Sequence, residues 1–453
     1  MRGEHLLKIG VSGIRGVVGE FLTPGLACAF GQAFGTYVGP GRVVIGRDTR
    51  TSGEMLQHAV TCGLLASGCE VIDVGVLPTP TIQIYVQASG ARGGLAVTAS
   101  HNPPEYNALK LFNRRGLFFN SYERSELVDL YHQSEFRHAT NDEIGQVRSD
   151  YQTPKRLHIE RVLAHVDAAR IRRRRFRVAL DAVNGSASLM ACEFLRDALG
   201  CDLTAIHVDP SRPFPRIAEP RPDTLGELAA LVRSCGCDVG FAQDPDADRL
   251  AVVDETGRVL DNDDVLALVI EAVLERRAGD VVVNLTTSSA VDIIAHRYGC
   301  RVWRTPVGEA NVVEQMLATG AAIGGEGSNG GVIFPAVHAC RDSFTAMAFL
   351  LDRMAATGEP VSRLAGRLPR FWRRFGQVTF EHGRLGAMMQ ALEEMFPDAE
   401  TDRSDGLKLI FDGAWVHVRA SNTEPLVRLA AEADSPERLE TLYGEVSRLL
   451  ERV

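Results

Sequence analysis

The sequence lacks several features that mark common protein classes. Its 453 residues include 49 Lys and Arg against 58 Asp and Glu, so a basic surface for nucleic acid or an acidic membrane is not expected. No apolar run is long enough to cross a bilayer, and the first residues carry no signal-peptide core, so we expect a cytoplasmic protein without a membrane segment. The nine cysteines are an odd number and lack metal-site spacing, which favours free thiols. The remaining composition is that of a globular chain of three or four domains.

Three segments of the chain repeat one pattern. A short β-branched run opens into a polar loop in RVVIGRDTRTSG from Arg42, in RVALDAVNGSAS from Arg177 and in DVVVNLTTSSA from Asp280. Each pattern predicts a buried strand followed by a capped helix start. A Gly-Cys pair then precedes a second strand in all three segments. The repeats therefore predict three related α/β domains.

Each repeat reaches a third apolar run that ends in a polar loop: GGLAVTASHNPP, DVGFAQDPDADR and AAIGGEGSNGG. In α/β sheets, loops at the carboxyl ends of strands form the ligand crevice, so these loops are expected to converge. After about Phe371 the pattern changes to short strands and two helical stretches, which indicates a smaller α+β domain. The predicted fold class is α/β, with three related mixed-sheet domains and the smaller one around a central cleft. The predicted boundaries are 1–150, 151–254, 255–367 and 368–453.

The first two polar loops carry a hydroxyl and a row of carboxylates. In TASHNPP, Ser100 stands on a turn stiffened by two prolines, which suits a nucleophile or phosphate carrier, although a turn-capping serine is the other interpretation. In DPDADR, an extended backbone would place Asp244, Asp246 and Asp248 on one face, where three carboxylates suit a cation such as Mg²⁺. A solvated acidic loop is the alternative.

Two further loops offer sugar and phosphate contacts. GGEGSNGG displays Glu326 and Ser328, which suit sugar hydroxyls. It also contains a formal G-x-G-x-x-G, but the VIFPAVH that follows is not a helix start, which disfavours a dinucleotide site. RASNTEPLVR, residues 419–428, supplies arginine, hydroxyl and amide donors for a phosphate, with a capped helix start as the alternative.

This order of loops resembles the α-D-phosphohexomutase superfamily, which includes phosphoglucomutases, phosphomannomutases and phosphoglucosamine mutases. The likeness runs from SGIRG at Ser12 through TASHNPPEYNALK, DPDADR, TPVGE and GEGSNGG to RASNTEP. The resemblance implies a phosphoryl group on Ser100 and Mg²⁺ held by Ser100 with Asp244, Asp246 and Asp248. It implies that Arg15, His101, Lys110 and Arg249 line the reaction centre. It implies that the substrate is bound by Thr305, Gly308, Glu326, Ser328, Arg419, Ser421, Asn422, Thr423 and Arg428.

The implied activity moves a phosphoryl group between O6 and O1 of a hexose phosphate through a bisphosphate intermediate, with a hexose 1,6-bisphosphate as primer. His101 and Lys110 are both candidates for proton transfer. Loop three departs from the GEMSGH of many phosphoglucomutases and phosphomannomutases and resembles the GEGNGG of archaeal-type phosphoglucosamine mutases. This favours glucosamine 6-phosphate to glucosamine 1-phosphate, with a phosphomannomutase/phosphoglucomutase as the alternative.

Two other classes of function remain compatible with the sequence. A metal-dependent phosphohydrolase would use an aspartate of DPDADR as nucleophile and release inorganic phosphate. A catalytically silent sugar-phosphate sensor would bind without turnover. In every case the expected partner is a hexose phosphate, with no nucleic acid and no membrane, and the protein is expected to be a monomer or homodimer.

Overall fold

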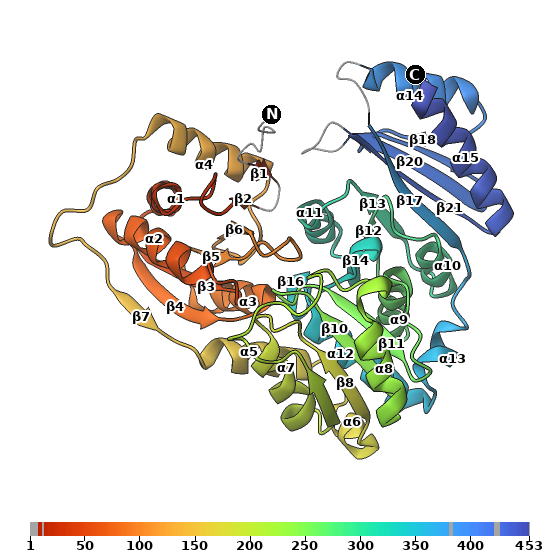
Figure 1. The fold of residues 1–453 in the computed structure, drawn as a ribbon, viewed down its shortest axis with the longest axis horizontal. Helices are drawn as coiled ribbons and strands as arrows, with labels where there is room; N and C mark the ends of the chain where they lie inside the picture. Colours follow the sequence, from red (N-terminus) through yellow and green to blue (C-terminus); the bar gives the residue numbers. More distant parts are fainter. Residues whose placement is uncertain (1–7, 11–12, 380–383, 421–425, 453) are drawn as a thin grey trace. The chain divides into compact units, whose positions relative to one another are not determined.

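The computed structural model describes residues 8–10, 13–379, 384–420 and 426–452 (Figure 1). The chain forms two compact units. The first contains residues 1–265 and 329–366, and the second contains residues 266–328 and 367–453.

The first unit begins with a seven-stranded sheet in the order β1-β2-β6-β5-β3-β4-β7. Its strands are β1 (Lys8–Gly10), β2 (Gly13–Val17), β3 (Arg42–Arg47), β4 (Glu70–Val76), β5 (Gly93–Val97), β6 (Tyr106–Asn113) and β7 (Val147–Ser149). The accompanying helices are α1 (Pro24–Val38), α2 (Gly53–Ala66), α3 (Thr79–Ser89) and α4 (Ser121–Gln133). β3, β4, β5 and β7 run parallel, and β6, β2 and β1 continue the sheet in antiparallel pairs, so the sheet is mixed.

Alternating apolar side chains give this sheet two separate cores. Val43 and Ile45 of β3 pack with Phe30 of α1 and Leu56 of α2 on one face. Val44, between them, belongs to the opposite core, where α3 contributes Ile82 and Val86. Because successive side chains of a strand point to opposite faces, a strand covered on both sides must be apolar throughout. The continuous run VVI in the sequence has this origin.

The second sheet of the first unit has the order β11-β10-β8-β9. Its strands are β8 (Arg177–Asp181), β9 (Asp202–Ile206), β10 (Val239–Gln243) and β11 (Leu250–Asp254). The surrounding helical segments are α5 (Thr153–Leu163), α6 (Ala168–Arg174), α7 (Ser188–Cys192), the π-helical η1 (Glu193–Ala198), the 3₁₀ turn η2 (Pro222–Thr224) and α8 (Gly226–Cys235). β8, β9 and β10 are parallel and β11 is antiparallel to β10, which repeats the mixed arrangement of the first sheet. The unit is completed by β15 (Gly331–Phe334), β16 (His338–Arg341), α12 (Ser343–Thr357) and α13 (Val361–Ala365).

The third repeat provides parallel strands in the order β13-β12-β14 in the second unit. Their bounds are β12 (Val281–Asn284), β13 (Val302–Thr305) and β14 (Ile323–Glu326), with η3 (Gly327–Asn329) after β14. The helices of this segment are α9 (Asn262–Leu274), which crosses the boundary between the units in the sequence, α10 (Ala290–Arg297) and α11 (Glu309–Thr319). The predicted order of strand, loop and helix therefore recurs in all three repeats.

The C-terminal segment of the second unit is an antiparallel sheet in the order β17-β21-β20-β19-β18. Its elements are β17 (Trp372–Thr379), α14 (Leu385–Met395), β18 (Glu400–Asp402), β19 (Leu407–Phe411), β20 (Ala414–Ala420), β21 (Leu426–Ala433) and α15 (Pro436–Arg452). Both helices cover the same apolar core of this sheet (Figure 1). The interpretation of residues 419–428 as one loop is wrong at its ends, because Arg419 lies in β20 and Arg428 in β21. Among the described residues, no helix combines the length and apolar content needed to span a membrane.

Candidate functional site

Ser100 lies in the turn that follows β5. Its backbone φ is +50°, in the left-handed region that a non-glycine residue occupies at a cost of about 1 kcal/mol. The residue is 3% exposed, and its Oγ donates a hydrogen bond of 2.7 Å to Asp244 Oδ2. His101 Nδ1 lies 3.3 Å from the same Oγ. The turn therefore directs the serine hydroxyl from the first sheet toward the loop of the second.

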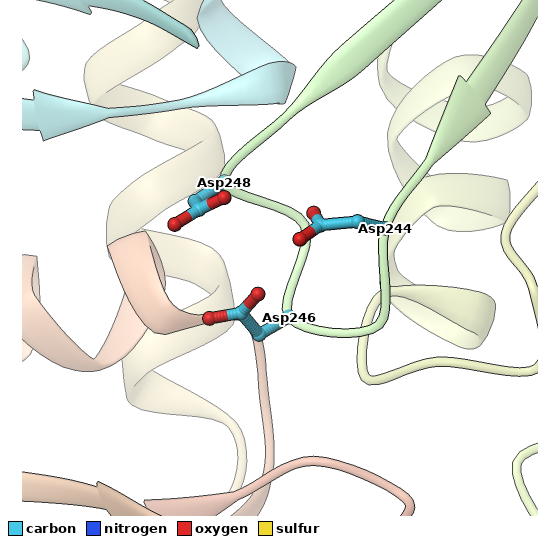
Figure 2. Close-up of side chains that lie close together, drawn as sticks. All are labelled: Asp244, Asp246 and Asp248. Atoms are coloured by element: carbon cyan, nitrogen blue, oxygen red, sulfur yellow. The ribbon is translucent and has the colours of Figure 1, made fainter. Parts of the chain in front are cut away.

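Asp244, Asp246 and Asp248 form a buried carboxylate cluster between β10 and β11 (Figure 2). One oxygen from each lies within 4.8 Å of the others. The prediction of an extended backbone here is wrong, because the chain turns at Ala247, whose φ is +55°. The turn brings the three side chains toward a common centre, as an extended strand would not.

The cluster has a donor set that fits a divalent cation. Asp246 Oδ1 and Asp248 Oδ1 are buried and accept no hydrogen bond from any described residue. Burial and the neighbouring charges of Asp248 and Asp246 raise the pKa of Asp244 well above its ordinary value. Burial would also raise the pKa of Asp246, but the ammonium group of Lys110 outweighs it and holds that pKa below the ordinary range. Carboxylate oxygens are the ligands that Mg²⁺ prefers in proteins. A bound cation would also offset the repulsion between neighbouring carboxylates.

The raised pKa of Asp244 predicts a pH-dependent stability for the metal-free protein. The pKa of Asp244 is higher in the folded protein than its value of about 4 in the unfolded chain, so the protonated side chain stabilises the folded state at pH below about 4. This stabilisation is lost as the pH rises through the folded-state pKa. In a chelator, wild type should therefore lose more unfolding free energy than Asp244→Asn as the pH rises from about 4 toward neutral.

Denaturant titration of both proteins and of Asp202→Asn, an exposed aspartate on β9, measures this difference. Mg²⁺ should remove the pH-dependent loss in wild type. Parallel curves for wild type and Asp244→Asn in chelator would contradict the assignment.

Basic side chains surround the cluster. Lys110 Nζ lies 2.6 Å from Asp246 Oδ2 and 3.6 Å from Asp248 Oδ2, and Arg341 donates a 2.7 Å hydrogen bond to Asp248 Oδ2. Burial lowers the pKa of Lys110, but the two carboxylates raise it above the ordinary value, so the side chain is charged at neutral pH. Among the described residues, two cluster oxygens nevertheless remain without a hydrogen-bond partner.

His101, Arg15 and Arg249 complete the group of residues that the sequence analysis assigned to the reaction centre. Burial, followed by the positive charges of Arg249 and Arg15, lowers the pKa of His101 to about 2. Arg15 donates to Asn102 Oδ1 at 2.7 Å, and Arg249 donates to Glu219 Oε1 at 2.7 Å. The structure thus brings all five catalytic candidates of the first unit around the carboxylate cluster, with His101 in its neutral form.

The second unit holds the sugar-loop candidates. Glu326, at the end of β14, accepts hydrogen bonds from Gly308 N at 2.8 Å and Asn284 Nδ2 at 3.0 Å. Ser328 Oγ lies 3.4 Å from Thr286 Oγ1. Thr305 ends β13, directly before the loop that contains Gly308. The strand ends and the loop therefore gather these four candidates in one part of the unit.

Arg419 and Arg428 stand directly opposite each other in the β20–β21 pair. The pKa of Arg419 is lowered below its ordinary value, mainly by burial and also by the charge of Arg428. The charges of Asp405 and Glu326 oppose this shift. Like charges opposite each other destabilise a sheet, so an anion bound between them would be favourable. Ser421, Asn422 and Thr423, predicted beside them, lie outside the described residues.

Comparison with known proteins identifies the chain. The phosphoglucomutase/phosphomannomutase models match throughout: alpha/beta/alpha domain I over residues 6–138, domain II over 156–257, domain III over 261–371 and the C-terminal domain over 378–449. A phosphoglucomutase/phosphomannomutase of Thermococcus kodakarensis is 40% identical over 452 residues, 98% of each chain. The chain belongs to this family. The predicted superfamily is confirmed, and so is the fold class of three related α/β domains with a smaller C-terminal domain.

Other members of the family carry a different name or a known structure. A probable phosphoglucosamine mutase of Methanopyrus kandleri is 37% identical over 447 residues, covering 98% of this chain and 97% of the relative. The crystal structure of a phosphoglucomutase/phosphomannomutase family protein from Burkholderia thailandensis superposes with a TM-score of 0.86 at 28% identity, covering 98% and 97% of the two chains. Relatives of similar identity thus carry names with different sugars.

Sequence reasoning missed two arginines near the family's motifs. Arg341 donates a hydrogen bond to Asp248, 93 positions away in the sequence, and no pattern in the residues next to Arg341 predicts that contact. Arg50 stands in the quoted motif GRDTRTSG but was given no role. Its position three residues after β3, at the carboxyl end of a parallel strand, was the available signal.

Proposed function

We propose that the protein is a phosphohexose mutase that moves a phosphoryl group between O6 and O1 of a hexose phosphate through phosphoserine at Ser100. The observation that carries this proposal is the 2.7 Å contact between Ser100 Oγ and Asp244 Oδ2, within a buried cluster of three carboxylates. A hydroxyl fixed at a cation site is placed to carry a phosphoryl group whose charge the cation offsets.

In the proposed reaction the bond between phosphorus and Ser100 Oγ breaks as a bond from phosphorus to a sugar hydroxyl oxygen forms. The product is a hexose bisphosphate. After this intermediate reorients, its other phosphoryl group returns to Ser100, and the isomerised monophosphate leaves. A hexose 1,6-bisphosphate therefore serves as primer for an unphosphorylated serine.

The residues around Ser100 divide the tasks of proton transfer and charge stabilisation. Lys110 is charged, so it can donate a proton or stabilise phosphoryl oxygens but cannot accept the hydroxyl proton. Neutral His101, 3.3 Å from Ser100 Oγ, can accept a proton, although its low pKa makes it a weak base. Asp244, Asp246 and Asp248 together with the Ser100 oxygen would hold Mg²⁺, which when bound supplies compensation for the charge of the transferred group.

The distal phosphate of the substrate is assigned to Arg419 and Arg428. Because the two phosphates exchange places during the reaction, this clamp must accept either end of the sugar. Arg419→Gln should raise KM for the hexose phosphate by about 10- to 100-fold, the effect of losing a charged hydrogen bond, with a smaller change in kcat. Steady-state kinetics measure it, with Arg438→Gln, an exposed arginine of α15 paired with Asp434, as the matched control. An unchanged KM would contradict the clamp.

Glucosamine phosphate is the proposed substrate, with phosphomannomutase/phosphoglucomutase activity as the alternative. The support is GEGSNGG, which departs from GEMSGH and resembles the archaeal-type GEGNGG, together with relatives named as probable phosphoglucosamine mutases.

Conversion of glucosamine, glucose and mannose 6-phosphates at equal concentration, followed by phosphorus NMR, tests both the substrate and the mutase activity. The highest kcat/KM is expected for glucosamine 6-phosphate. A higher value for glucose or mannose would overturn the substrate, and release of inorganic phosphate without isomerisation would overturn the mutase and favour the phosphohydrolase.

A further inference from the structure

The three repeats share a polar side chain at the end of their first strand. Asp48 directly follows β3, Asp181 is the last residue of β8, and Asn284 is the last residue of β12. All three are buried, with exposures of 1%, 1% and 0%. In each repeat this side chain is linked by hydrogen bonds, directly or through an arginine, either to the last residue of the third strand or to the loop after it.

In the first repeat the link passes through Arg50. Its Nη2 donates to the carbonyl oxygens of Ser100 at 2.6 Å and Asn102 at 2.7 Å. Its Nη1 donates to the carbonyl oxygens of Pro103 at 2.7 Å and Tyr106 at 3.0 Å. Arg50 is 4% exposed, and its two Nη atoms bind four carbonyl oxygens between the end of β5 and the start of β6.

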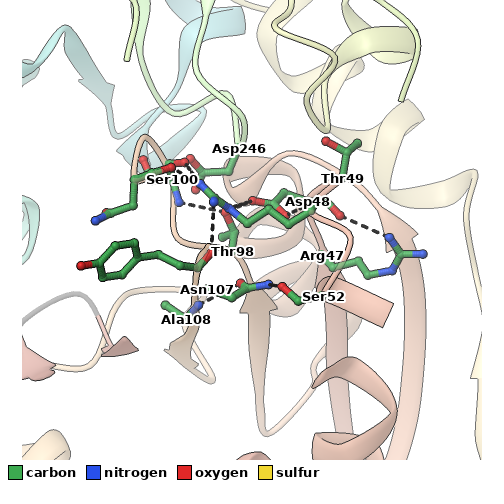
Figure 3. Close-up of polar contacts among 12 residues, drawn as sticks. Arg47, Asp48, Thr49, Ser52, Thr98, Ser100, Asn107, Ala108 and Asp246 are labelled. Atoms are coloured by element: carbon green, nitrogen blue, oxygen red, sulfur yellow. Dashed lines mark hydrogen bonds and ion pairs between the residues drawn. The ribbon is translucent and has the colours of Figure 1, made fainter. Parts of the chain in front are cut away.

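Asp48 and Thr98 complete this arrangement (Figure 3). Asp48 Oδ2 accepts from Arg50 Nε at 3.1 Å and from Thr98 Oγ1 at 2.6 Å. Thr98 Oγ1 in turn accepts from Ser100 N at 3.0 Å. Ser100 is therefore held at both its backbone N–H and its carbonyl, which fixes the left-handed backbone that directs its side chain.

In the second repeat the link passes through Arg216. Its Nε donates to Asp181 Oδ2 at 2.8 Å, and its Nη2 donates to the carbonyl oxygen of Gln243 at 2.9 Å. Gln243 directly precedes Asp244. In the third repeat Asn284 reaches Glu326 without an arginine. The first two repeats thus use an arginine in a similar way: Arg50 holds the loop after β5, and Arg216 holds the last residue of β10, from which the carboxylate loop starts.

We propose that Arg50 and Arg216 are positioning residues for two separate parts of the reaction, Arg50 for Ser100 and Arg216 for the carboxylate cluster. The inference rests on the proposed function and extends it to two residues that have been assigned no contact with substrate or metal. A lysine cannot replace either arginine, because an ammonium group is a compact point charge and lacks the planar fork that spans a carboxylate and several carbonyls.

Two readouts separate these roles from general structural damage. Single-turnover transfer from a hexose 1,6-bisphosphate to Ser100 reports the position of the hydroxyl, and Mn²⁺ binding to the unphosphorylated protein reports the carboxylate cluster. Arg50→Lys should slow transfer by about 10- to 100-fold and raise the Mn²⁺ dissociation constant by no more than about threefold, because it displaces Ser100, only one of the four oxygen ligands assigned to the metal. Arg216→Lys should weaken Mn²⁺ binding by about 10-fold or more.

Arg170→Lys is the matched control, because Arg170 donates through Nε and Nη2 to Asp352 Oδ1, away from both loops. It should change neither readout. If thermal unfolding shows that Arg50→Lys does not fold, Thr98→Val removes the contacts to Asp48 and Ser100 N and should slow transfer in the same way. Guanidinium should partly restore transfer in Arg50→Ala.

Equal losses of transfer and Mn²⁺ binding in both arginine variants would overturn the inference, as would wild-type transfer in Arg50→Lys and Thr98→Val. Wild-type Mn²⁺ affinity in Arg216→Lys would overturn its second half. If wild type itself takes no phosphate on Ser100, the proposed function fails instead, a result distinct from wild-type labelling that the variants leave unchanged.

Discussion

Ser100→Ala is expected to lower kcat on the order of 10⁴-fold or more, equivalent to about 5 kcal/mol of transition-state stabilisation. The side chain is the hydroxyl that reaches Asp244, and alanine leaves no oxygen to carry the phosphoryl group. The loop should keep its position, because Arg50 contacts the carbonyl oxygen of residue 100, which alanine retains. A coupled mutase assay and a thermal unfolding curve measure the two effects separately.

Ser211→Ala serves as control for Ser100→Ala, because Ser211 is exposed and its hydrogen bonds within the described part of the chain go only to Asp209, in its own loop. It should keep wild-type turnover. Undiminished turnover in Ser100→Ala would contradict the phosphoserine mechanism. A loss of turnover that is caused by unfolding would be accompanied by a change in the circular dichroism spectrum.

Removal of divalent cations is expected to lower turnover on the order of 10³-fold, and added Mg²⁺ should restore it. The physical reason is that three buried carboxylates lie beside Ser100 Oγ, and among the described residues two of their oxygens have no hydrogen-bond donor. Without a cation they would repel the phosphoryl group that Ser100 is proposed to carry. Asp248→Asn should give a loss of similar size that Mg²⁺ does not restore.

Dialysis against a chelator followed by metal titration provides the measurement for this prediction. Asp202→Asn changes an exposed aspartate on β9 and should respond to Mg²⁺ as wild type does. Full turnover in excess chelator would contradict the assignment of the cluster to a metal.

Much of the fold could be predicted because its signals are local. The buried strand VVI of β3 and the helix start after GRDTRTSG can each be predicted from neighbouring residues, and the same pattern recurs at β8 and β12. The family resemblance also depends on short motifs. β21 was missed because its first three residues, 426–428, follow a turn-rich segment and were interpreted with it as a phosphate loop.

The candidate site was harder to predict, because its properties depend on contacts between distant positions. Lys110 and His101 could not be ranked from the sequence, since the charge of Lys110 depends on Asp246, 136 positions away. The converging carboxylates depend on the left-handed turn at Ala247, a residue type that seldom adopts that conformation. The role proposed for Arg50 depends on the carbonyl groups of Ser100 and Asn102, which are 50 and 52 positions along the chain.

Phosphopeptide mapping after incubation with Mg²⁺ and a hexose 1,6-bisphosphate tests the central claim most directly. The account predicts phosphate on the peptide that contains Ser100, in wild type and not in Ser100→Ala. Label on an aspartate of residues 244–248, or no label while inorganic phosphate accumulates, would contradict it.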